Sequence, residues 1–202
     1  MVLVRGTRAQ AEAIKEETAV LMRERMRLTL SAEKTRITHV DDGFDFLGFR
    51  LRRCPRPGRL PVAYSFPSER SLREVKHRIK ELTGRQTIGL SLDQLVRALN
   101  PVLRGWTNYH RHGASKRCFV YLDHYLWWRV VRWLRKKHPG LTWKQVKRRY
   151  WGHDWTSPEG VRLYWPARVA VTRYRYRGQR IPTPWAILDE CAATSRGEVD
   201  PA

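Results

Sequence analysis

The chain has 202 residues, of which 40 are Lys or Arg and 19 are Asp or Glu, and its formal net charge is +21. That length suits one domain or two small ones, and nine Trp, eight Tyr and five Phe exclude intrinsic disorder as the main description. No apolar stretch reaches the roughly 18–20 residues of a membrane span, and we expect a cytoplasmic protein. Three widely spaced cysteines fit neither a disulfide framework nor a CxxC zinc site.

The positive charge is concentrated in one part of the chain. Residues 101–180 contain 19 basic and three acidic residues, a local net charge of +16, together with 16 of the 22 aromatic residues. Clustered cations attract a polyanion and release counterions on phosphate contact, and aromatic side chains can stack on unpaired bases. We therefore favour a nucleic acid as partner over a solvated basic face, an anionic membrane surface or an acidic protein.

The first 66 residues predict a region that contains strands. Thr7 and Gln10 form a capping box for a helix that ends near residue 26. A turn is predicted at Asp41-Asp42-Gly43, between the second and third of four strands. The predicted strands cover residues 1–5, 36–40, 44–51 and 61–66.

From residue 68 the pattern becomes helical. Pro101 lies inside one predicted helix and indicates a kink or break at Asn100. The predicted helices run over 68–82 with Ser68 as cap, 91–112 with a Ser91/Gln94 capping box, 119–137, and from the Thr142/Gln145 capping box to 150. Alternating Tyr and Arg residues predict a strand over 169–177. The sequence thus predicts an α+β fold, with a partial antiparallel sheet and one helix, then a mainly helical domain and a short C-terminal strand.

Two sequence motifs stand close together before the helical region. They are Leu30–Ile37 (LSAEKTRI), in which Lys34 is a cation on a turn, and Gly43–Phe49 (GFDFLGF), in which Gly48 permits close backbone approach. In this order they resemble the last palm segments of group II intron reverse transcriptases, also called maturases. The resemblance implies that Lys34 occupies a position near the polymerase active site. It also implies that Phe46, Leu47 and Gly48 belong to the hairpin called the primer grip.

The resemblance continues through most of the chain, to about residue 187. It is carried by Leu99–His110 (LNPVLRGWTNYH), the Trp-rich helix that ends in Lys137-His138-Pro139, Val171–Gly178 (VTRYRYRG) and Ile181–Trp185 (IPTPW). It implies a C-terminal remnant of the reverse transcriptase palm over 1–66, a maturase-specific thumb domain over 67–187, and a flexible tail over 188–202.

The chain also departs from the family. Family members place a YADD-type double aspartate just before the segment that resembles Met1–Val4, and the fingers lie further upstream. Because nucleotidyl transfer needs carboxylates that hold two Mg²⁺ ions, we expect no intact catalytic site beyond the family-position Lys34. We expect no cofactor in this chain, and Mg²⁺ only if the polymerase site is completed in trans. Asp41 and Asp42 are expected to form a turn and not a substitute metal site.

In the family, the thumb packs on structured intron RNA and on the template–primer duplex. We therefore expect the basic residues of the thumb-like part to contact RNA. The candidates are Arg104, Asn108, Lys116, Arg117, Arg129, Arg132, Lys136, Lys147, Arg148, Arg149, Arg173 and Arg175. For Arg104, an internal salt bridge or helix cap is an equal alternative, and for Trp106, Trp127 and Trp133 core packing is favoured.

Three functions stay open at this stage. The first is an RNA-binding fragment that assists splicing and mobility through structured intron RNA or an RNA–DNA hybrid. The second is an RNA-directed DNA polymerase completed in trans by an upstream fingers/palm half. The third is a degenerate remnant without a selected function. None of the three requires a membrane.

Overall fold

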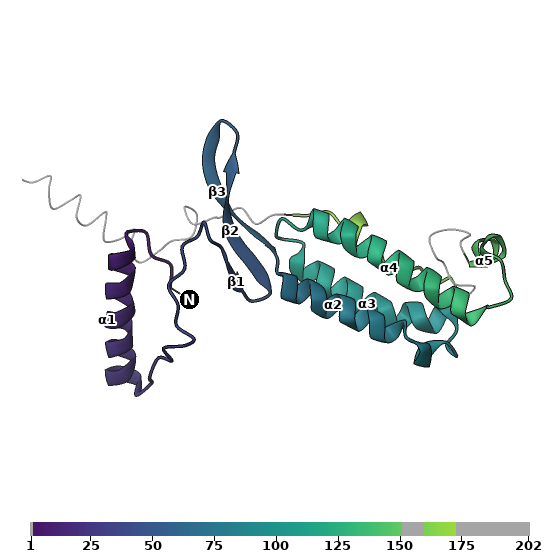
Figure 1. The fold of residues 1–202 in the computed structure, drawn as a ribbon, viewed down its shortest axis with the longest axis horizontal. Coiled ribbons are helices and arrows are strands. Elements are labelled where there is room, and N and C mark those ends of the chain that lie inside the picture. Colours follow the sequence, from purple (N-terminus) through teal and green to yellow (C-terminus); the bar gives the residue numbers. More distant parts are fainter. Residues whose placement is uncertain (1, 151–159, 173–202) are drawn as a thin grey trace, which may run out of the picture. The chain divides into compact units, whose positions relative to one another are not determined.

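The computed structural model describes residues 2–150 and 160–172, which belong to one unit spanning Met1–Thr172. These residues form an α+β fold, as predicted (Figure 1). In chain order the elements are α1 (Arg8–Met26), β1 (Phe44–Phe46), β2 (Phe49–Arg56), β3 (Arg59–Pro67), α2 (Glu69–Leu82), the 3-10 turn η1 (Arg85–Thr87), α3 (Leu92–His110), α4 (Lys116–Lys137), α5 (Trp143–Tyr150) and the 3-10 turn η2 (Pro166–Arg168).

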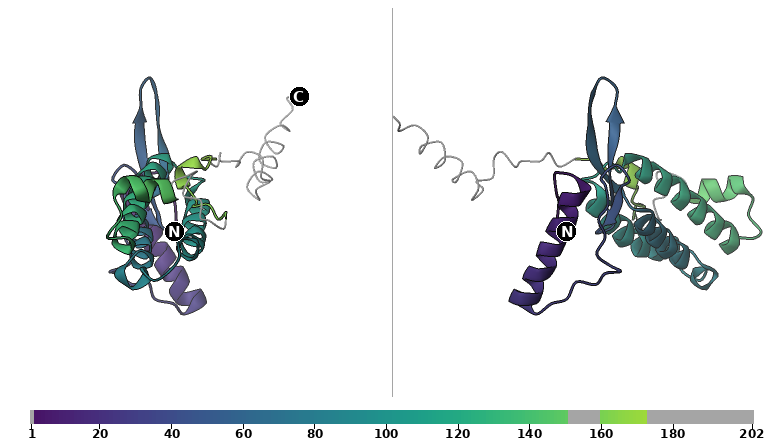
Figure 2. Two further views of the ribbon diagram at one scale, coloured as in Figure 1. Left: turned by 90° about the vertical axis from the view of Figure 1, so that its right-hand side faces the viewer. Right: turned by 60° about the vertical axis from the view of Figure 1, so that its left-hand side comes forward.

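The three strands form one antiparallel sheet in the order β1-β2-β3. The turn between β1 and β2 is Leu47-Gly48, because Phe46 pairs with Phe49 and leaves only two residues between the strands. Leu47 and Gly48 have φ values of 46° and 76°, the left-handed conformation that a tight two-residue hairpin requires. The strands β2 and β3 continue as a two-stranded ribbon that turns between Arg56 and Arg59 (Figures 1 and 2).

Two strand predictions near the N-terminus are wrong. Residues 2–5 and 36–40 lie outside the three strands, and the hairpin turn is not at Asp41–Gly43. Asp41 and Asp42 do form a turn, but it precedes β1. The Leu-Gly pair supplies the two left-handed positions of the real hairpin, whereas 36–40 is tied to β2 by the bond from the Arg53 amide to the Val40 carbonyl (3.0 Å).

The helical part is built around side chains from α2, α3 and α4. Helix α2 packs against both other helices (Figure 1). Within α2, α3 and α4, apolar residues that recur at spacings of three and four are buried. The fully or almost fully buried residues include Val75, Ile79, Leu95, Leu99, Leu103, Leu122, Leu126, Val130, Trp133 and Leu134.

The helix starts agree closely with the capping motifs. Thr7/Gln10 and Ser91/Gln94 form complete capping boxes, Ser68 caps α2, and Thr142 and Gln145 exchange hydrogen bonds before α5. Helix α4 begins at Lys116, three residues earlier than predicted.

Pro101 does not break α3, which runs from Leu92 to His110. The neighbouring Leu99 and Leu103 are fully buried and hold both halves of the helix against the core. The Asn100 side chain adds a clamp outside the helix: its Nδ2 donates to the Arg162 carbonyl and its Oδ1 accepts from the Tyr164 amide, both at 2.8 Å.

A small polar cluster around His110 joins α2 to α3, and Phe49 of the hairpin packs against it. The fully buried His110 has its Nε2 2.9 Å from the Ser71 hydroxyl, which also accepts from the Trp106 indole at 3.0 Å. The Phe49 ring of β2 lies 4.7 Å from the imidazole. Burial lowers the pKa of His110 to about 4, so the imidazole is neutral at physiological pH.

The predicted strand at 169–177 is wrong in its described part, because 169–172 is not strand. Residues 173–177 and the predicted tail at 188–202 lie outside the described residues. The predicted boundary between a palm remnant (1–66) and a thumb domain (67–187) stays a prediction. Within the part of the chain that the structure describes, no helix is both long and apolar enough to cross a membrane.

Candidate nucleic-acid interface

The charged residues of α2 are segregated between two sides of the helix. On one side, carboxylates neutralise the cations. The pairs are Arg70 with Glu74 (2.9 Å), and Arg78 (3.0 Å) and His77 (3.5 Å) with Glu81. On another side, cations recur at spacings of three and four residues and so share one face. They are Arg73, Lys76 and Lys80.

The second, basic side of α2 borders α4. The Lys76 ammonium donates to the Tyr121 hydroxyl at 2.8 Å and lies 5.0 Å from the ring centroids of both Tyr121 and Tyr125. The Tyr125 hydroxyl donates to the Lys76 carbonyl at 3.3 Å. These contacts join the basic row of α2 to α4.

Helix α4 presents cations and aromatic rings along its exposed side. The residues recur at spacings of three and four, and all of them are exposed. They are Arg117, Tyr121, His124, Trp128, Arg132 and Arg135. Together with the three cations of α2, they form a surface that we call the α2–α4 face. It combines cations with exposed aromatic rings.

The single acidic residue of α4, Asp123, lies away from this face. It is partly buried against η2, where its Oδ2 accepts from the Ala167 amide at 3.1 Å. Burial raises its pKa to about 6, although this hydrogen bond and the charges of Arg168 and Lys116 oppose the shift. The Lys116 ammonium donates to the Ala167 carbonyl. Lys116, a predicted RNA contact, therefore also helps to hold η2.

Arg129, another predicted RNA contact, forms hydrogen bonds with the end of α2. It is half-buried, its Nε donates to the Thr83 hydroxyl at 2.8 Å, and its Nη2 donates to the Lys80 and Thr83 carbonyls, both at 3.0 Å. These carbonyls belong to the C-terminal turn of α2, where a cation is favoured by the helix dipole. Its contact with RNA stays a prediction.

We expect Arg129→Met to lower the free energy of unfolding by about 1–3 kcal/mol, because it leaves these C-terminal acceptors without their charged donor. Urea denaturation measures the change. Arg132→Met, an exposed site on the same helix, is the matched control and should change stability by less than about 0.5 kcal/mol. Unaltered stability in Arg129→Met would show that the three hydrogen bonds contribute little.

The other predicted RNA contacts fall at several places in the helical part. Arg104 and Asn108 are exposed on α3, and the Arg104 guanidinium lies 5.6 Å from the Tyr164 ring centroid. Arg117 and Arg132 belong to the α2–α4 face. Exposed residues in the last turns of α4 and α5 account for the rest: Lys136, Lys147, Arg148 and Arg149. Arg173 and Arg175 lie outside the described residues.

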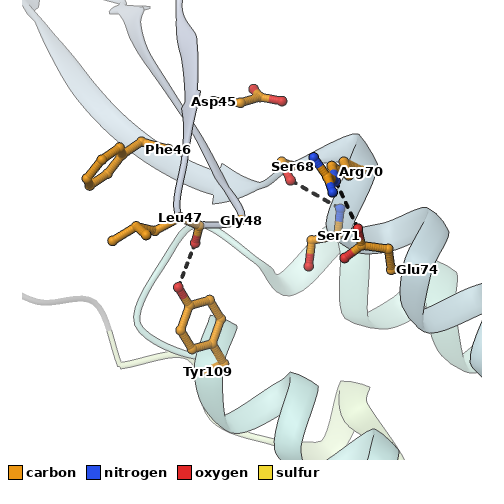
Figure 3. Close-up of a pocket in the computed structure, with 9 residues that line it drawn as sticks. All are labelled: Asp45, Phe46, Leu47, Gly48, Ser68, Arg70, Ser71, Glu74 and Tyr109. Carbon is orange, nitrogen blue, oxygen red and sulfur yellow. Dashed lines mark hydrogen bonds and ion pairs between the residues drawn. The ribbon is translucent and has the colours of Figure 1, made fainter. Parts of the chain in front are cut away.

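The predicted primer-grip residues lie at the hairpin tip. The Leu47 carbonyl accepts from the Tyr109 hydroxyl of α3 at 2.6 Å, and the Gly48 carbonyl accepts from the Ser68 amide at 2.9 Å. A hollow of about 480 Å³ lies beside this tip. Figure 3 shows the side chains that line it. Its lining residues are Asp45, Phe46, Leu47, Gly48, Ser68, Arg70, Ser71, Glu74 and Tyr109. The hairpin tip is thus held in place while the Leu47 side chain stays 69% exposed.

The two remaining predictions concern the polymerase chemistry. Lys34 is exposed on a turn and is not among the residues that line the hollow. Asp41 pairs with Arg53 (3.2 Å) and His39 (3.3 Å). Over residues 2–150 and 160–172, no three His, Cys, Asp or Glu side chains come together as a metal site.

Sequence reasoning missed several residues of the α2–α4 face. They are Arg73, Lys76, Lys80, Tyr121, His124, Trp128 and Arg135. The signal was present as spacings of three and four residues on two predicted helices. What the sequence did not show is that the basic side of α2 faces α4.

This helical part has a recognisable family. Residues 72–151 match the family model described as "Group II intron, maturase-specific domain". The match begins within α2 and includes α3, α4 and α5. The resemblance predicted from the sequence is therefore confirmed over this part of the chain, where the helices match the group II intron maturase-specific domain.

A curated relative supports the same assignment. Protein YkfC of Escherichia coli (strain K12) is 43% identical over 72 residues. The matched segment is 35% of this chain and 19% of the relative, so the chain matches about one fifth of the length of that protein.

Proposed function

We propose that this chain binds structured RNA of a group II intron, or an RNA–DNA hybrid, and assists splicing and mobility. The α2–α4 face carries the proposal. It places six cations, from Arg73 to Arg135, on two packed helices of the part that matches the maturase-specific domain, and the single carboxylate of α4, Asp123, lies away from them. A surface of this charge fits the phosphate backbone of a folded RNA.

Salt dependence tests the phosphate contacts. If roughly six to ten phosphates are contacted, affinity for a structured intron RNA should fall about 10³- to 10⁵-fold between 50 and 200 mM salt. Filter binding or fluorescence anisotropy with the full chain measures this. Undetectable or salt-insensitive binding would contradict the proposal.

A matched pair of variants on one helix locates the binding surface. Arg73→Gln/Lys80→Gln removes two cations from the α2–α4 face and should lower the slope of log K against log salt by roughly 1–2. Arg70→Gln/Arg78→Gln removes the same charge from the side where carboxylates already neutralise it. That control should change the slope much less. Equal effects would show that total charge, and not this face, determines binding.

Splicing is tested separately from binding. The cognate intron RNA should splice faster in low-magnesium buffer when the chain is added, and Arg73→Gln/Lys80→Gln should lose this effect along with its binding. Binding without faster splicing would retain an RNA-binding function but contradict the maturase role.

A second candidate is RNA-directed DNA polymerisation completed in trans. The observation that favours it is the hairpin tip, whose shape is fixed by Tyr109 and Ser68 even though no YADD motif occurs in the sequence. A primer-extension assay with and without a separately encoded fingers/palm half decides this. Mg²⁺-dependent extension only with both parts would support it.

A further inference from the structure

The α2–α4 face holds more exposed aromatic surface than phosphate binding requires. Trp128 is 43% exposed and Tyr121 is 46% exposed, whereas Trp133 on the same helix is 1% exposed. An indole left at the surface gives up the hydrophobic gain of burial. Its position at the centre of a basic surface points to a ligand that is both anionic and aromatic.

Contacts on both sides hold the Trp128 ring in one orientation. Its Nε1 donates to His124 Nε2 at 3.0 Å, one helical turn earlier. The Trp127 ring stands perpendicular to it, at 89° with centroids 4.7 Å apart, and itself packs against Trp143 of α5. A ring fixed before binding loses little conformational freedom when a ligand stacks on it.

Cations flank the ring at positions where a nucleic-acid backbone could pass. The Arg132 guanidinium lies 6.0 Å from the Trp128 ring centroid, one turn towards the C-terminus. Two turns in the other direction, Lys76 contacts Tyr121. Proteins hold single-stranded nucleic acid by combining cations that contact the backbone with aromatic rings on which bases stack.

We propose that the α2–α4 face binds an unpaired segment of RNA, with one base stacked on Trp128 and the adjacent phosphates bound by Arg132 and neighbouring cations. This inference rests on the proposed function and specifies its ligand. In a continuous duplex the bases are stacked on one another, so a duplex would use the cations and leave the indole without a partner. An acidic protein would likewise use only the charge.

The test compares two RNA probes of equal length on the full chain. One is a hairpin with an unpaired loop, and the other is a continuous duplex. Trp128→Ala should weaken binding of the loop probe roughly 5- to 150-fold, the range for loss of one stacked base, and change binding of the duplex by less than about twofold. Trp128→Phe should retain most of the affinity. Val120→Ala, which removes a 54% exposed apolar side chain from the same helix, is the matched control and should behave as wild type.

Abasic loop nucleotides separate stacking from charge, because they keep the phosphates and remove the bases. The abasic loop should bind wild type more weakly, but Trp128→Ala should bind the intact and the abasic loop equally. The salt slope of Trp128→Ala should equal that of wild type, whereas Arg132→Gln should lower it by about 0.7–0.9.

Three results are possible and each is decisive. The proposal is supported if Trp128→Ala and the abasic loop each weaken binding, and if combining them weakens it no further. Undiminished loop affinity in Trp128→Ala, or an equal loss on loop and duplex, overturns it while salt-dependent binding leaves the proposed function standing. If neither RNA binds, the proposed function fails and this inference fails with it.

Discussion

Replacing Trp133 with alanine is expected to lower the free energy of unfolding by about 3–5 kcal/mol, the range for deleting a buried aromatic side chain. Trp133 is 1% exposed, and its indole N–H donates to the Thr87 hydroxyl of η1 at 3.1 Å. The Lys137 ammonium lies 5.4 Å from its ring centroid and donates to the Ile88 and Leu90 carbonyls. The substitution therefore removes core packing and loosens the loop between α2 and α3.

The matched control is the exposed tryptophan of the same helix. Trp128→Ala should lower stability by less than about 1 kcal/mol, because most of its lost contacts are at the surface. Chemical denaturation followed by far-UV circular dichroism compares the two variants. Similar losses in both would show that the exposed indole stabilises the fold, and would weaken the case for a binding role.

The second large effect is the pH dependence of stability at Asp123. Its pKa is raised from 3.8 to about 6, so the folded state holds this proton more tightly than the unfolded state does. The protonated form is therefore favoured on folding, and stability falls as the pH rises from about 4 to about 6. At neutral pH the buried charge costs at most about 3 kcal/mol, which follows from the size of the shift.

Asp123→Asn removes this charge and keeps the shape. An amide oxygen can still accept from the Ala167 N–H, but the new NH₂ group takes the place of Oδ1, which has no partner, and this reduces the gain. We expect a stabilisation of about 1–3 kcal/mol at pH 7 that disappears below pH 4. Urea denaturation between pH 4 and pH 8 measures it. Asp45→Asn, at a 49% exposed carboxylate paired with Arg50, is the control and should change stability by less than about 1 kcal/mol.

His110 produces the opposite slope in the same pH range. Because its pKa is lowered from 6.5 to about 4, the unfolded state binds more protons in that interval, and stability falls as the pH falls. The two groups partly compensate each other in the wild type. In Asp123→Asn the pH dependence due to His110 is no longer offset. The variant should therefore lose stability more steeply than the wild type between pH 6 and pH 4. A parallel pH profile for the two proteins would contradict this account.

Local signals in the sequence predicted the helices well. Ser and Thr caps and the apolar spacing of Leu95, Leu99, Leu122 and Leu126 depend on neighbours within one helix, and these elements appear where expected. The position of the hairpin was harder to predict from the sequence. Asp-Asp-Gly and Leu-Gly both favour turns, and the choice between them depended on which residues could pair across the strands.

The site was predictable only in part, because charge does not show where a side chain points. Arg117 and Arg132 lie on the α2–α4 face as exposed cations, whereas Arg129, on the same helix, is turned towards the end of α2. Hydrogen bonds to Thr83 and Lys80, which are distant in the sequence, hold the Arg129 side chain there, and the sequence of α4 alone does not show these partners. The spacings of the acid–base pairs of α2 can be found in the sequence. That the remaining cations of α2 lie beside α4 can be seen only from the structure.

The bond between Tyr109 and Leu47 joins residues 62 positions apart, and Phe49 packs on the buried His110. The segment that folds cooperatively should therefore start before residue 72, where the family match begins, and include the β1–β2 hairpin. A fragment cut at residue 67 would expose one side of His110 and lose the hydrogen bond from the Ala114 amide to the Ser65 carbonyl. The hairpin that resembles part of a polymerase would then cover one side of His110 and belong to the same folding unit as the helices.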